Sequence, residues 1–92
     1  MSHTIQSKAK LIARVRRIKG QVEAVERALE AEVGCADVLM LVASLRGAIQ
    51  GLSVEVMEEH IRHNVVNPDT DPEPRRAKGA AELIEVVRTY LK

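Results

Sequence analysis

Two long stretches of this chain carry apolar residues at alternating spacings of four and three, and this repeat constrains the fold more than any other feature. On an α-helix such a repeat forms one apolar seam that another helix must cover. The first seam is Leu11, Val15, Ile18, Val22, Val25 and Leu29, and the second is Val38, Val42, Leu45, Ile49, Leu52 and Val56. With a shorter apolar stripe near the C-terminus, the pattern predicts helices over about 5–32, 37–64 and 75–91.

The length of the chain limits it to one domain, residues 1–92. A monomer of this size buries little surface, and a single cysteine excludes an internal disulfide. Only one aromatic residue is present, so the core must be built from aliphatic stripes. We therefore expect an all-α fold, a three-helix protomer that forms an antiparallel helical-bundle dimer with a second copy.

Breaks between the helices are marked by turn-forming residues. Gly34 is predicted to stop the first helix, with Asp37 in the first turn of the second. The stretch from Asn67 to Pro74 is predicted to be a loop. Four-residue spacing of the small residues Ala43, Gly47 and Gly51 favours close approach of another helix over loose helix propensity.

The sequence contains no apolar run long enough to cross a bilayer and no signal-peptide pattern at its start. We therefore expect a cytoplasmic protein that makes no membrane contact. In that reducing compartment the cysteine would be a thiol, available as core filler, metal ligand or nucleophile.

Basic residues are concentrated in the first helix, whereas the net charge of the chain is only +1. Residues 1–22 contain six cations and no acidic residue, and on a helix the cations flank both sides of the seam. Such a surface fits double-stranded DNA better than an ordinary solvated face or an anionic lipid surface. The six cations are Lys8, Lys10, Arg14, Arg16, Arg17 and Lys19.

Other classes of protein are disfavoured by missing patterns. No zinc-finger or short helix-turn-helix spacing is present, so DNA contact must come from the surface of a bundle. An enzyme could use Glu55, Glu58 and Glu59 beside the histidines, but bundle di-metal sites need Glu-x-x-His pairs, and Met57 breaks that pattern. A protein that served only as a scaffold would have no use for residues 1–22, which carry six cations and no acidic residue. We expect no enzymatic activity.

Cys35 and the histidines form the one candidate site for a small ligand. Cys35 lies at the predicted start of the long second helix, whereas His60 and His63 lie near its end, about 40 Å away at 1.5 Å per residue. They cannot meet within one chain. In an antiparallel dimer Cys35 of one protomer can approach His60 of the other, and His3 can join them from the N-terminal arm.

The order of these features resembles the CsoR/RcnR/FrmR family of copper-, nickel/cobalt- and formaldehyde-responsive repressors. The resemblance covers nearly the whole chain. It rests on the segment Arg14 to Val22, the lone Cys35, the segments Arg46 to Leu52 and Glu55 to His60, and the ending Val87 to Lys92. It implies a homodimer, a homotetramer made as a dimer of dimers, and a repressor that leaves a G/C-rich operator when an inducer binds.

The resemblance assigns roles to particular residues. It places Arg14, Arg16, Arg17 and Lys19 in the DNA-binding region, with Lys10 and Arg46 as further candidates. Cys35 and His60 fall at the sensing site between protomers, and the nickel/cobalt branch adds His3.

The inducer is left open between a nickel- or cobalt-type divalent ion (zinc included) and formaldehyde. The nickel/cobalt branch has a histidine where this chain has Asn64, and an amide is a poor ligand, so His63 or water would replace it or affinity would fall. The formaldehyde branch, which needs no cofactor, has proline where this chain has Ser2, whose amine could still trap a hydroxymethyl group on Cys35. The resemblance disfavours two other inducers, because the copper branch has a second cysteine near the position of Asn64 and a persulfide sensor needs one at the position of His60.

Overall fold

The computed structural model describes residues 7–91, and every regular element in that part of the chain is helical. Helix α1 spans Lys8–Glu30 and α2 spans Cys35–His60; a short π-helical turn, η2, continues α2 over Ile61–Val65, and α3 spans Pro74–Tyr90. These bounds confirm the predicted all-α protomer and its order of elements.

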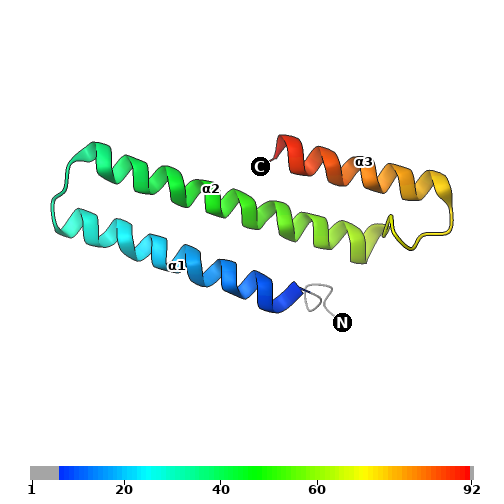
Figure 1. The fold of residues 1–92 in the computed structure, drawn as a ribbon, viewed down its shortest axis with the longest axis horizontal. Helices are drawn as coiled ribbons and strands as arrows, with labels where there is room; N and C mark the ends of the chain where they lie inside the picture. Colours follow the sequence, from blue (N-terminus) through cyan, green and yellow to red (C-terminus); the bar gives the residue numbers. More distant parts are fainter. Residues whose placement is uncertain (1–6, 92) are drawn as a thin grey trace.

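The described helices lie side by side in one layer (Figure 1). Helix α1 runs antiparallel to α2 along its length, and α3 folds back along the second half of α2 on the opposite side (Figure 1). The molecule measures 57 × 27 × 12 Å, and the smallest extent is about the diameter of one helix. Helical domains are stabilised by packing layers against one another, so this protomer has two broad faces still to be covered.

The turn between α1 and α2 differs from the sequence-based expectation. Glu32, and not a glycine, adopts the left-handed conformation, with φ of 54°. The amide of Glu32 donates to the carbonyl of Leu29 at 3.1 Å, and the amide of Val33 donates to that of Ala28 at 3.2 Å, which is the Schellman pattern. Gly34, with φ of −59°, instead precedes the first residue of α2, so its prediction as the stop of α1 is wrong.

The predicted loop before α3 is confirmed, and local hydrogen bonds fix its path. The side chain of Asn67 accepts from the amide of Asp69 at 2.9 Å, and that of Asp71 accepts from the amide of Glu73 at 2.8 Å. The carboxylate of Glu73 then accepts from the amides of the second and third residues of α3, and Pro74 occupies the first position. These contacts turn the chain back toward α2.

The core of the described protomer is small and lies where α3 packs on the end of α2. Val54, Ile61, Ile84 and Val87 form its one cluster of buried residues. No side chain in the described part of the chain is less than 2% exposed. Most of the apolar surface is therefore not buried by this chain alone.

The two predicted seams are each divided between an inner and an outer row. The inner row of each seam is buried or half-buried where α1 and α2 pack together. The outer row is 38–59% exposed. The inner residues are Leu11, Ile18 and Val25 on α1 with Val38, Leu45 and Leu52 on α2; the outer residues are Val15, Val22 and Leu29 on α1 with Val42, Ile49 and Val56 on α2.

The second helix is longer and more apolar than the sequence analysis expected. Together α2 and η2 form a continuous helical segment, Cys35–Val65, whose length and composition suffice to cross a membrane. The expectation that no stretch reaches this length is therefore wrong. One such helix is weak evidence for a membrane span, because long helices of soluble bundles meet the same criteria.

Candidate functional site

Four of the predicted DNA-binding residues are exposed on the helix surfaces. Arg16, Arg17 and Lys19 lie on α1, and Arg46 lies on α2. Within residues 7–91 none of these four side chains makes an ion pair. They are therefore available for an external anion such as a phosphate group.

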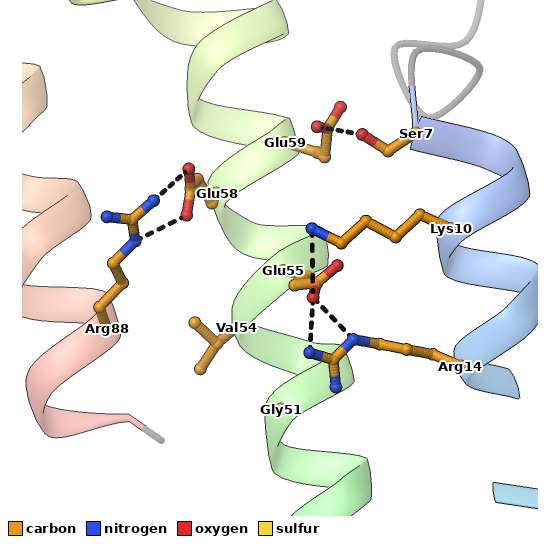
Figure 2. A pocket seen from close by; sticks show the side chains of 9 residues that line it. All are labelled: Ser7, Lys10, Arg14, Gly51, Val54, Glu55, Glu58, Glu59 and Arg88. Atoms are coloured by element: carbon orange, nitrogen blue, oxygen red, sulfur yellow. Dashed lines mark hydrogen bonds and ion pairs between the residues drawn. The ribbon is translucent and has the colours of Figure 1, made fainter. Parts of the chain in front are cut away.

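Arg14 and Lys10 instead turn toward α2 and meet Glu55 (Figure 2). The Arg14 guanidinium donates a hydrogen bond from Nε to Oε1 of Glu55 at 2.6 Å, and its Nη2 forms an ion pair with the same oxygen at 2.6 Å. Lys10 Nζ lies 3.8 Å from that oxygen. The side chain of Arg14 is 36% exposed and that of Lys10 is 71% exposed. Arg14 is therefore half-buried against α2, whereas Lys10 stays largely exposed.

Gly51 makes room for the Arg14 guanidinium one helical turn before Glu55 (Figure 2). A β-carbon at position 51 would lie 3.0 Å from Nη1 of Arg14, closer than ordinary van der Waals contact. The expected approach of a helix backbone along the small-residue stripe is therefore not found within the described protomer. At Gly51 the neighbour is a charged side chain, and a β-carbon at Gly47 would meet no described atom within 4 Å.

Further carboxylates on α2 bind side chains from both neighbouring helices (Figure 2). Glu58 accepts hydrogen bonds from Arg88 of α3 and from Arg62 of its own segment. Burial alone would raise the pKa of Glu58, but the hydrogen bonds and charges of these two arginines hold it below its usual value. Glu59 accepts from the hydroxyl of Ser7 at 2.5 Å. Glu58, Glu59 and Arg88, with Glu55 and Arg14, line a cavity of about 280 Å³.

Cys35 and His60 are the first and last residues of α2. Cys35 is a free, exposed thiol in the first turn of the helix. The 26-residue helix separates the two residues by about 38 Å at 1.5 Å per residue, as the sequence predicted. One protomer therefore does not bring them together.

The other predicted sensing residues near the end of α2 are engaged within their own segment. The amide nitrogen of Asn64 lies 3.3 Å from Nδ1 of His60. His63 Nε2 lies 3.4 Å from Oε2 of Glu59, an ion pair when the ring is protonated, and that oxygen accepts no hydrogen bond from a described residue. Ser2 and His3 lie outside the described residues. Among the described residues no three His, Cys, Asp or Glu side chains are grouped to hold a metal.

Sequence reasoning missed Glu55 as the partner of Arg14 and Lys10. A usable signal was present, because Glu55 follows the seam residue Leu52 by three residues and so lies beside the seam that a neighbouring helix must cover. An acidic residue at such a position selects basic partners across the helix pair. Which basic residue Glu55 contacts also depends on how far α1 is shifted along α2, and the spacing of residues in the sequence does not determine that shift.

A single-layer helical protomer with exposed cations and largely uncovered apolar rows fits a DNA-binding protein that uses its helix surfaces. The sequence model of the metal-sensitive transcriptional repressor family matches residues 7–89. This chain belongs to that family, the CsoR/RcnR/FrmR repressors, as the sequence motifs predicted.

Individual relatives support the assignment over the full length of the chain. The repressor RcnR of Salmonella paratyphi B is 39% identical over 92 residues and 100% of both chains. An uncharacterised protein from the bioA 5′ region of Serratia marcescens is 47% identical over the same span. The structure of a variant of the formaldehyde-responsive regulator FrmR from Salmonella enterica serovar Typhimurium is 40% identical, with a TM-score of 0.67 over 97% of this chain and 99% of that one.

Proposed function

We propose that this protein is a cytoplasmic repressor that binds double-stranded operator DNA through the exposed cations of α1 and α2. The observation that carries the proposal is the set of Arg16, Arg17, Lys19 and Arg46, which make no ion pair with any described residue. Guanidinium groups fit phosphate oxygens, and a surface of unpaired cations gives salt-dependent binding. Membership of a repressor family supports the same function.

The assembly proposed is a homodimer of antiparallel protomers, with two dimers forming a homotetramer. Support comes from the outer rows of both seams, which include Val22 and Ile49, because their apolar surface needs a covering layer. An antiparallel partner helix would bring Cys35 of one protomer beside His60 of the other. This arrangement also doubles the number of cations offered to DNA.

The inducer proposed is a nickel- or cobalt-type transition metal held at this intersubunit site. Thiolate sulfur and imidazole nitrogen are suitable donors for nickel, cobalt or zinc. Asn64 lies against Nδ1 of His60. With its amide oxygen turned toward the ring, it would accept from Nδ1–H of a histidine that binds metal through Nε2, a role that suits an amide better than that of a ligand. His63 fits a ligand role less well, because its ring lies beside Glu59. His3 would complete the donor set from the N-terminal arm.

Formaldehyde sensing is the second candidate, favoured by the exposed thiol of Cys35 and by the likeness to a formaldehyde-responsive regulator. The thiolate would add to formaldehyde and form a hydroxymethyl thioether. The α-amine of a partner chain, on Ser2 once Met1 is removed, would then displace water and leave a methylene crosslink. No metal is needed for this reaction.

Binding of the inducer would weaken DNA affinity only if the released conformation binds it more tightly. The bound inducer would connect the N-terminal arm to the start of one α2 and the end of the other. We expect this connection to move α1, which carries most of the exposed cations. DNA release would then follow from a change in where those cations lie relative to one another.

The decisive experiment measures fluorescence anisotropy of a labelled G/C-rich duplex at two salt concentrations, followed by parallel titrations with nickel, cobalt, zinc, copper(I) and formaldehyde. We expect tight binding that weakens as salt rises, and release by nickel or cobalt. Absence of salt-dependent binding contradicts the repressor proposal, and release by formaldehyde alone contradicts the metal proposal.

The same titrations with Cys35→Ala test the site. The variant is expected to lose inducer-dependent release, whereas Ser53→Ala, an exposed change on α2 far from both of its ends, is expected to retain it. Release of the Cys35→Ala variant at wild-type inducer concentrations would exclude Cys35 from sensing.

A further inference from the structure

Arg14 is held against α2 by two independent features of the described protomer. Glu55 accepts a hydrogen bond from Nε of its guanidinium and forms an ion pair with Nη2, and the lack of a side chain at Gly51 leaves the space in which that guanidinium lies (Figure 2). The Arg14 guanidinium is therefore held against α2, whereas Arg16, Arg17 and Lys19 make no ion pair with a described residue. Lys10 lies at the edge of the same contact.

We propose that Glu55 and Gly51 form an intramolecular docking site for Arg14 that competes with DNA phosphate for its guanidinium. The contact is then autoinhibitory, because a repressor with Arg14 docked offers one fewer cation per protomer to the duplex. This inference rests on the proposed DNA-binding function and adds a residue, Glu55, that sets how strong the binding is.

Charge and geometry both support competition. The carboxylate oxygen that accepts from Nε and pairs with Nη2 occupies the edge of the guanidinium that a phosphate would otherwise contact, so the two partners exclude each other. The pair is also only partly buried, with 36% of the Arg14 side chain and 20% of the Glu55 side chain exposed. A partly exposed ion pair is weak enough to exchange for another anion.

The opposite role for Glu55 predicts a different result. If Glu55 instead orients Arg14 for DNA, removing its charge loosens Arg14 and weakens binding. The direction of the change in DNA affinity therefore separates competition from positioning. The dependence of log affinity on log salt separates them again, because each cation that newly contacts a phosphate steepens the slope by about 0.9.

The test compares two pairs of matched variants by anisotropy with the same labelled G/C-rich duplex. Glu55→Gln removes the carboxylate charge, and its control Glu82→Gln makes the same change at an exposed position on α3. Gly51→Ala pushes the guanidinium outward without changing charge, and its control Gly79→Ala adds a β-carbon in α3 where no described atom lies within 4 Å.

We expect Glu55→Gln and Gly51→Ala each to bind about two- to fivefold more tightly than its control, the range that corresponds to a partly exposed ion pair. Both variants should also show a steeper salt dependence. In an Arg14→Gln background most of the gain from Glu55→Gln should disappear, because the residue released by that change is absent.

Three results overturn the inference. These are weaker or unchanged binding of both Glu55→Gln and Gly51→Ala relative to their controls, a shallower salt dependence in Glu55→Gln, or a full gain from Glu55→Gln in the Arg14→Gln background. Failure of the proposed function is seen separately, since the unsubstituted protein would then show no salt-dependent binding at all. Circular dichroism of each variant verifies that its helices are intact.

Discussion

The Arg88 guanidinium holds both oxygens of the Glu58 carboxylate and so ties α3 to α2. Nε of Arg88 donates to Oε1 and Nη2 donates to Oε2, each at 2.9 Å. A bidentate ion pair of this geometry fixes the orientation of the two side chains and also stabilises the contact between α2 and α3. Because the buried core beneath it is one small cluster, this polar contact is an important part of the docking of α3.

Replacing Arg88 with glutamine is therefore expected to lower the free energy of unfolding, and by more than the loss of an unpaired charge elsewhere on α3. Urea denaturation followed by circular dichroism measures the change, at one fixed protein concentration because the assembly contributes to stability. Arg75→Gln is the matched control, since it removes the same charge from the exposed start of α3. An equal loss in both variants would contradict a specific role for the Arg88 pair.

The lowered pKa of Glu58 leads to a prediction of how the stability of the protein depends on pH. Glu58 is held between Arg88 and Arg62, which lower its pKa below the usual 4.5 in the folded protein. A group whose pKa is lowered by folding adds stability above its usual value, and the stability is lost as the pH falls through the folded value. We expect the difference in free energy of unfolding between the wild type and Glu58→Gln to be constant from pH 7 to about 5 and to shrink below pH 4.5. A difference that does not change with acidification would show that Glu58 is not the titrating group.

The left-handed turn at the end of α1 offers a stabilising substitution. Glu32 has φ of 54°, a conformation that costs a residue with a β-carbon about 1 kcal/mol and costs glycine little. Glu32→Gly is expected to raise the free energy of unfolding by roughly 0.5–1 kcal/mol. Glu32→Ala, which removes the charge and keeps the β-carbon, should give no such gain. Equal stability of the two variants would mean that the charge of Glu32, and not its backbone, sets the effect.

Much of the fold follows from the spacing of apolar residues. Alternating steps of four and three located α1 and α2. That each seam divides into a row packed between the two helices and an exposed row follows from how α1 packs on α2 and was not predicted. The end of α1 was not predictable in the same way. The sequence offers a glycine at position 34, but the Schellman hydrogen bonds close two residues earlier and force Glu32 into the left-handed region.

Part of the candidate site could likewise be predicted from the sequence, and part could not. The separation of Cys35 and His60 follows from helix length alone, so sequence predicts that one chain cannot join them. The pairing of Arg14 with Glu55 needs the relative shift of two helices, a tertiary property that no local pattern specifies. The structure exposes three of the predicted cations, Arg16, Arg17 and Lys19, and holds Arg14 half-buried against Glu55.

The exposed outer rows lead to a prediction about assembly. Ile49 lies in the middle of the outer row of α2 and is 46% exposed in the protomer. A lysine there would place a charge inside an apolar contact between copies, where burying it unpaired is costly. Ile49→Lys is therefore expected to reduce the mass measured by sedimentation toward that of a single chain at micromolar concentration, and to lower the free energy of unfolding.

Gln50→Lys provides the matched control for this prediction. The residue is the immediate neighbour of Ile49 on α2, it is exposed, and it lies outside both rows of the seam. The variant adds the same charge, so it should sediment as the wild type does. If Ile49→Lys keeps the wild-type mass, the outer row of α2 is not where copies of the chain meet, and the covering layer must lie against another face of the protomer.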